Sequence, residues 1–140
     1  MASKTESFRT HHSDVRGLAA RIEGLLDTAA IRADAGPAAT VVRELFGKFG
    51  VHLAIEDATL YPRMIAHQDL HLRQAAERFQ REMGDLSARF DEYRRRWPGP
   101  NAISCDPAGF VKETREMLSS LLRRIAREDR ELYDLYDRAS

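Results

Sequence analysis

Near the middle of the chain lies the stretch His52-Leu53-Ala54-Ile55-Glu56-Asp57, inside a long segment whose apolar residues have helical spacing. With a period near 3.6 residues, the buried face of this segment carries, in order, Val41, Leu45, Phe49, His52, Glu56 and Thr59. His52 and Glu56 are four residues apart, so both lie on the same helix face. Burying a histidine and a carboxylate without partners is costly. The partner can be a metal ion, another side chain or a water, and its identity decides what the protein does.

The length of 140 residues predicts a single domain over residues 1–140 with a full-sized core. Four helical segments are expected, at about residues 5–29, 37–67, 70–96 and 107–138. Asp69 and Asp106 are placed as N-caps of the third and fourth segments, and Pro62 kinks the second or ends its regular part near Leu60. The chain shows neither strand-like alternation nor a detectable repeat. We therefore predict an all-α fold, an antiparallel up-down-up-down four-helix bundle.

This topology brings polar interruptions of the apolar faces to one level of the bundle. The second and fourth segments run opposite to the first and third, so a position near the start of the first meets positions past the middle of the second and fourth. The places that converge are His12, His52 with Glu56, Phe79 to Met83, and Glu128 with Asp129. The sequence thus predicts that these four places converge at one level of the core.

Charge and composition exclude several classes of function. The 22 basic and 22 acidic side chains cancel, so the chain lacks the general positive field that nucleic acid or an anionic membrane requires. No stretch is apolar and long enough to span a bilayer or to serve as a signal peptide. The single cysteine, Cys105, excludes an intrachain disulfide and fits a reducing compartment. We expect a cytoplasmic protein.

With these residues in view, the chain resembles the hemerythrin-like (HHE cation-binding) family over nearly its whole length. The resemblance rests on His12, the H-x-x-x-E of His52 and Glu56, Leu60-Tyr61-Pro62, and the stretch from Arg124 to Tyr133. The family pattern implies a hemerythrin-like bundle with a di-iron centre. Its ligands are five histidines, a bridging glutamate and a bridging aspartate.

This chain departs from that pattern at three positions. By the resemblance, His12, His52, Glu56 and Asp129 match ligands, whereas Phe79, Met83 and Arg124 stand where the other three histidines belong. A phenyl ring and a thioether do not replace nitrogen ligands. The fixed positive charge of Arg124 repels a second cation, and it can pair with Glu56 or Asp129 instead. A full di-iron centre is therefore not expected.

We expect a single metal ion: iron, manganese or zinc. Its predicted ligands are His12, His52, Glu56 and Asp129, with Glu82 and Glu128 as further candidates. By resemblance the role is binding or sensing of iron, oxygen or nitric oxide, or metal homeostasis, with a small diatomic gas as partner. Redox enzymology at a single iron is a further alternative, although nothing in the sequence specifies a substrate pocket. His67 and His71 share the H-x-x-x-H spacing but straddle the cap at Asp69, so we place them at the surface.

The alternative is a metal-free bundle that acts through protein contacts or as a homodimer. The position of Arg124 separates the two hypotheses. A closed network of Arg124 with Glu56 and Asp129 would favour the metal-free protein, whereas an outward-turned Arg124 would leave the site open to a metal ion.

Overall fold

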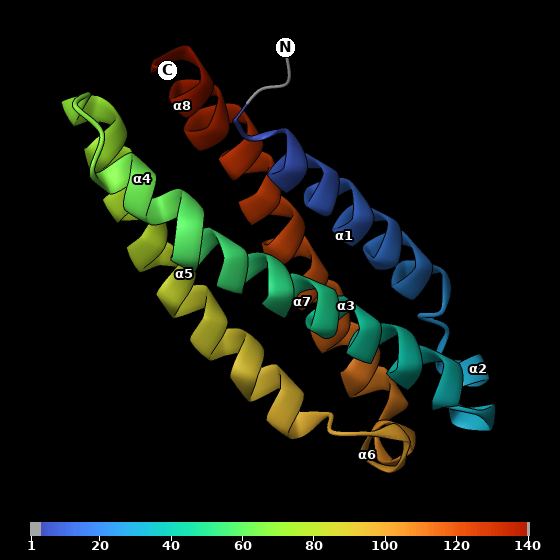
Figure 1. Cartoon of the computed structure of the whole chain (residues 1–140). Helices are drawn as coiled ribbons and strands as arrows, with labels where there is room; N and C mark the ends of the chain where they lie inside the picture. The colour runs from blue at the N-terminus through green and yellow to red at the C-terminus, as the bar shows by residue number, and fades with distance from the viewer. Residues whose placement is uncertain (1–3, 140) are drawn as a thin grey trace.

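The computed structural model describes residues 4–139 as four long helical rods packed side by side (Figure 1). The first rod is α1 (Glu6–Gly24), and the third is α5 (Leu70–Arg96). The second rod joins α3 (Gly36–Ile55), the π-turn η1 (Glu56–Leu60) and α4 (Tyr61–Ile65). The fourth joins α7 (Pro107–Arg127), the π-turn η2 (Glu128–Tyr133) and α8 (Asp134–Ala139). Two short helices, α2 (Thr28–Ala33) and α6 (Pro100–Cys105), lie in the links at one end.

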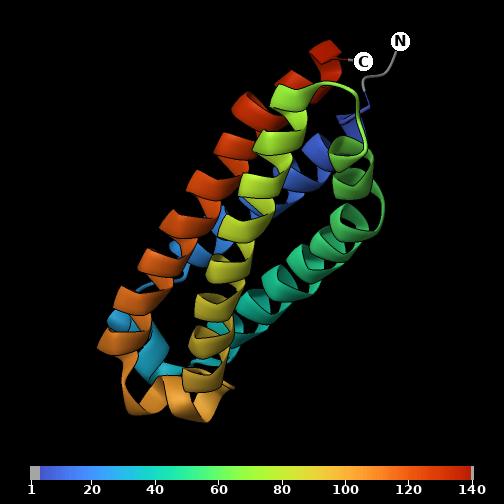
Figure 2. The same ribbon diagram turned by 90° about the vertical axis from the view of Figure 1, so that its left-hand side faces the viewer.

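The rods alternate in direction, so the start of α1 and the end of the fourth rod lie at the same end of the molecule (Figures 1 and 2). Every regular element between residues 4 and 139 is helical. The predicted all-α bundle is therefore confirmed.

Local capping explains where the rods begin. The Asp69 carboxylate accepts a hydrogen bond from the Leu72 N–H at 3.1 Å, and the Asp106 carboxylate accepts one from the Gly109 N–H at 3.0 Å. Pro107 follows Asp106 at the first helical position, where its missing N–H costs nothing. Both predicted N-caps are confirmed.

Two predicted boundaries are wrong, and each has a local cause. The first helix ends at Gly24 rather than continuing to residue 29, because Asp27 caps a new helix by accepting from the Ala29 and Ala30 N–H groups. The expected loop before Asp106 contains α6, which Pro100 begins.

The second rod changes geometry just before Pro62. Proline cannot donate the backbone hydrogen bond of a regular α-helix. The preceding turn is a π-turn, in which the Tyr61 N–H donates to the Glu56 carbonyl five residues earlier. A π-turn holds one extra residue, which rotates the face that follows it. As a result Leu60 is 2% exposed and Thr59, which we expected on the buried face, is exposed.

The core consists of two apolar clusters separated by a polar layer. The larger cluster is built around Leu45, Phe90 and Leu121, and the smaller around Leu72 and Leu132. Along the rods, residues of the polar layer stand where one cluster gives way to the other: His12 between Phe8 and Val15, His52 between Phe49 and Leu60, and Glu128 between Ile125 and Leu132. The polar layer is therefore inside the bundle.

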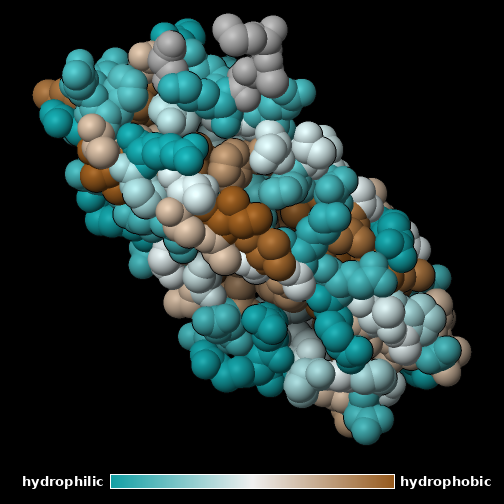
Figure 3. All heavy atoms as spheres, viewed as in Figure 1, coloured by the Kyte–Doolittle hydropathy of each residue, from teal (hydrophilic) through white to brown (hydrophobic). Residues whose placement is uncertain are grey.

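The surface in Figure 3 is largely polar, with apolar patches between the polar side chains. Over residues 4–139, the large apolar residues that are exposed are Val51, Ile55, Leu70 and Leu122. None of the helices over residues 4–139 is both long enough and apolar enough to cross a membrane.

Candidate metal centre

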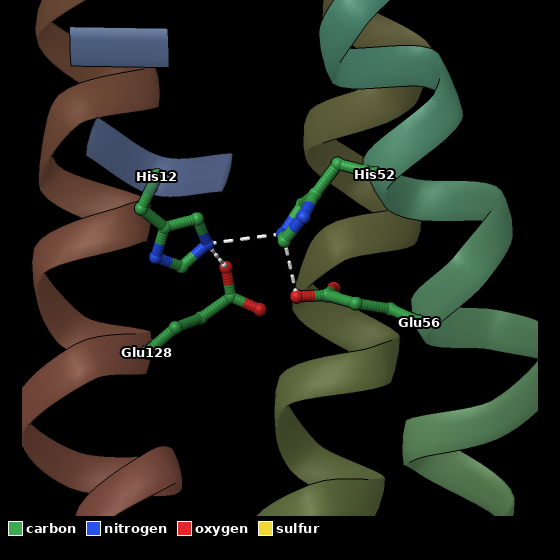
Figure 4. A group of neighbouring side chains, drawn as sticks. All are labelled: His12, His52, Glu56 and Glu128. Atoms are coloured by element: carbon green, nitrogen blue, oxygen red, sulfur yellow. Dashed lines mark hydrogen bonds and ion pairs between the residues drawn. The ribbon is translucent and has the colours of Figure 1, made fainter. Parts of the chain in front are cut away.

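Four buried side chains meet in the polar layer (Figure 4). His12 comes from α1 and His52 from the end of α3, while Glu56 and Glu128 are the first residues of the two π-turns. None is more than 1% exposed. One ligand atom of each lies within 4.8 Å of the corresponding atoms of the others. Ligands at 2.0–2.2 Å from one metal ion are separated by about 3–4.4 Å, so the cluster is close to the size of a coordination shell.

The atoms of this cluster point toward one another. His12 Nε2 lies 3.0 Å from His52 Nε2 and 3.4 Å from a carboxylate oxygen of Glu128. His52 Nε2 lies 2.7 Å from a carboxylate oxygen of Glu56, whose other oxygen, Oε2, is buried without a hydrogen-bond partner. A buried oxygen without a partner is unfavourable unless an ion or water satisfies it. The donor set of two imidazoles and two carboxylates fits iron, manganese or zinc.

Two tyrosines donate hydrogen bonds across the site, each to the carboxylate on the opposite rod. The Tyr61 hydroxyl, on the second rod, donates to Glu128 on the fourth at 3.1 Å, and the Tyr133 hydroxyl, on the fourth, donates to Glu56 on the second. Burial, followed by the charge of Glu128, raises the pKa of both phenols, so both remain protonated hydrogen-bond donors. The two rods therefore hold each other's carboxylate in place.

These tyrosines belong to a repeat that our sequence analysis missed. The six-residue pattern Glu-Asp-x-x-Leu-Tyr occurs at residues 56–61 and again at 128–133, so the expectation of no repeat was wrong. Each copy begins a π-turn and ends with the tyrosine that crosses to the other copy. The repeat extends backward by four residues, where His52 in one copy corresponds to Arg124 in the other.

Arg124 makes contacts that differ from both sequence-based expectations. Its Nη2 donates to the Phe79 carbonyl at 2.7 Å and to the Tyr61 hydroxyl at 3.0 Å, and lies 3.7 Å from Glu128. The guanidinium stacks over the Phe79 ring at 4.7 Å, and Glu82 lies 3.6 Å away at Nη1. Arg124 is buried but pairs with neither Glu56 nor Asp129. The closed network that would have favoured a metal-free protein is therefore not formed.

Asp129 lies behind His12 rather than inside the cluster. Its carboxylate accepts a hydrogen bond from His12 Nδ1 at 2.8 Å and one from Arg16 at 2.6 Å. A carboxylate on Nδ1 fixes the tautomer and ring orientation of a histidine whose Nε2 binds a metal. Of the four predicted ligands, the structure brings His12, His52 and Glu56 together and places Glu128, which we named as a further candidate, at the fourth position.

His52 also has a partner behind it. His11 Nδ1 lies 3.3 Å from His52 Nδ1, so one of the two rings donates to the other. Burial, followed by the charge of His52, lowers the pKa of His11, which favours its neutral form. The sequence pattern did not indicate this role for His11. His67 accepts a hydrogen bond from the Asp69 N–H, and His71 is exposed, so neither belongs to the cluster.

Without a metal ion, protons neutralise part of the negative charge. Burial opposes protonation of His12, but its hydrogen bonds to Asp129 and Glu128 outweigh burial and raise the pKa of His12 to about 9. Burial and the neighbouring Glu128 raise the pKa of Glu56. Burial also acts to raise the pKa of Glu128, but the hydrogen bond to His12 and the charge of Arg124 outweigh it and lower that pKa. A bound cation would take the place of the His12 proton.

A helical bundle whose core collects two imidazoles and two carboxylates around one point has the design of a cation-binding protein. The family model described as the hemerythrin HHE cation binding domain matches residues 3–136. The chain therefore belongs to the hemerythrin HHE cation-binding family. Comparisons with curated proteins and with solved structures return no match.

Proposed function

We propose that this protein binds one metal ion through His12 Nε2, His52 Nε2, Glu56 and Glu128. The observation that carries the proposal is the convergence of four buried ligand atoms within 4.8 Å, one of them on a carboxylate with an unsatisfied oxygen. Asp129 orients His12, and His11 orients His52. Iron, manganese or zinc suits this donor set.

The contacts of Arg124 support one ion rather than two. A second ion bound to Glu128 on its Arg124 side would lie close to a buried guanidinium, whose repulsion is strong where water is excluded. The nearby Phe79 and Met83 offer no nitrogen ligand. We infer that Arg124 supplies the positive charge that would otherwise come from a second metal ion.

The proposed role is binding or sensing in the cytoplasm. A bound iron would supply an open coordination position for a small diatomic gas, or a change of redox state. The chain itself contributes burial, which excludes bulk water from all four ligands, and two phenol donors that fix the carboxylates. Neither the burial of the ligands nor the two phenol donors depends on a pocket for an enzyme substrate.

One observation favours the metal-free alternative. The four side chains contact one another at hydrogen-bonding or ion-pair distances, so protons alone can hold the layer together. Elemental analysis of protein purified without chelators or a histidine tag distinguishes the two. We expect about one equivalent of metal. About two equivalents would contradict the role given to Arg124. If no metal is bound after reconstitution with Fe²⁺, Mn²⁺ and Zn²⁺, the metal-free bundle becomes the better hypothesis.

The ligand assignment makes a separate prediction for two adjacent acids. We expect Asp129→Asn to weaken metal binding roughly 10–100-fold, as loss of an outer partner of a ligand does, and Glu128→Gln to weaken it further, because a ligand is lost. Competition with a chelator measures both dissociation constants. Asp57→Asn is the matched control, because Asp57 is the exposed counterpart of Asp129 in the repeat. The reverse order, with Asp129→Asn the more damaging, would make Asp129 the ligand.

A further inference from the structure

The buried position of the proposed ligands raises the question of how a metal ion reaches them. Two surface hollows are lined in part by residues of the site or by Arg124, which lies beside the site. One has a volume of about 320 Å³ and is lined by residues of α5 and the fourth rod, including Arg124. The other has a volume of about 330 Å³, lies between α1 and α3, and is lined by His11, Gly47, Lys48, Val51 and His52.

The hollow at α5 is unfavourable for a cation. Its lining carries four positive charges against two negative ones: Arg89, Arg123, Arg124, Arg127, Glu82 and Asp85. Arg124 also stands next to Glu128 on this side. A positive field lowers the local concentration of cations and slows their approach.

The hollow between α1 and α3 has no such barrier. Its single permanent cation, Lys48, pairs with Asp14 at 3.2 Å. Gly47 adds no side chain to the hollow, and the space around its Cβ position is open to 4 Å. Val51, which also lines the hollow, is 60% exposed. The proposed ligand His52 is part of the lining of this hollow.

His11 lines this hollow together with His52 and covers part of the His52 ring. Its ring meets the His52 ring edge-on, with centroids 5.4 Å apart and the Nδ1 atoms 3.3 Å apart. His11 is only partly buried, whereas His52 is 1% exposed. Rotation of the His11 side chain away from His52 would uncover the His52 ring without moving a helix.

We infer that the hollow between α1 and α3 is the route by which a metal ion enters and leaves the site, and that His11 is its gate. The inference rests on the proposed metal site. It adds that access is controlled by residues that do not bind the metal in the final complex. Changing them alters the rates of binding and release together, since both cross the same barrier.

The probe is Co²⁺, with loading followed by stopped-flow absorbance and release followed after addition of excess EDTA. In Val51→Phe the larger side chain leans toward the helix N-terminus and covers Gly47 four residues earlier. We expect both rates to fall at least about fivefold with an unchanged dissociation constant. His11→Ala removes the gate and also the partner that orients His52. Both rates should therefore rise, the release rate by a larger factor than the loading rate.

Two control variants change similar side chains elsewhere. Leu122→Phe enlarges an exposed apolar residue on α7, and His71→Ala removes an exposed histidine, so both should keep the wild-type rates. Wild-type rates in Val51→Phe would overturn the route. A weaker dissociation constant in His11→Ala through faster release alone would overturn the gate and leave His11 as a partner of His52. If the wild-type protein binds no Co²⁺, the proposed function fails together with the route.

Discussion

Replacing His52 with alanine is expected to abolish tight metal binding while the helical fold is retained. His52 Nε2 faces both His12 and Glu56, so its loss removes one of four ligands and the contact that aligns two others. The affinity should fall by more than the roughly 10–100-fold typical of losing an outer partner. Elemental analysis gives the metal content, and far-ultraviolet circular dichroism reports the helices.

The same variant tests the metal-free alternative. If the polar layer binds no metal ion, neither the wild type nor His52→Ala contains metal, and the substitution changes only the stability of the protein. His71→Ala is the control, because this exposed histidine lies outside the cluster and should leave the bound metal unchanged. Full metal content in His52→Ala would remove His52 from the ligand set and contradict the proposed geometry.

Replacing Arg124 with leucine is expected to destabilise the metal-free protein by about 3–5 kcal/mol, the usual cost of breaking a buried ion pair by removing one partner. The variant loses the hydrogen bonds to Tyr61 and to the Phe79 carbonyl, and Glu128 loses a neighbouring positive charge. For a chain of this size the melting temperature should fall by roughly 10–20 °C.

Binding of a metal ion should restore part of the stability that is lost in Arg124→Leu. A bound cation compensates Glu128 and no longer meets repulsion from the guanidinium, so we expect the variant to bind metal more tightly and to gain more stability from saturating metal than the wild type. Thermal melts with and without metal measure both effects. Arg127→Leu is the matched control. Arg127 also stacks on Phe79 and pairs with Glu82, but it is partly exposed, and its removal should cost little. Weaker metal binding in Arg124→Leu would mean that Arg124 positions Glu128 rather than competing with the ion.

The repeat explains why the two carboxylates are interlocked. Each Glu-Asp-x-x-Leu-Tyr copy projects a carboxylate into the site and, five residues later, a tyrosine toward the opposite carboxylate. A π-turn at each copy sets this relation between glutamate and tyrosine. At the start of the repeat, His52 in one copy corresponds to Arg124 in the other, and this difference contributes to the asymmetry of the site.

Much of the bundle and three of the four residues of the site could be predicted from the sequence, because those features depend on local spacing, capping and helix direction. Apolar spacing predicted the four rods, and Asp69 and Asp106 predicted where two of them begin. The spacing of four residues placed His52 and Glu56 on one face. Alternating helix directions then brought His12 to the same level.

The tertiary structure decided the remainder. Glu128 and Asp129 are neighbours at the edge of one helix face, and only the π-turn and the packing of α1 against the fourth rod send Glu128 into the layer and Asp129 behind His12. The partners of Arg124 are a backbone carbonyl on α5 and a hydroxyl on the second rod, both distant in sequence. Spacing along one helix determines which side chains share a face. Which of two adjacent carboxylates reaches the ligand cluster depends on rotations and contacts that arise only when the rods pack.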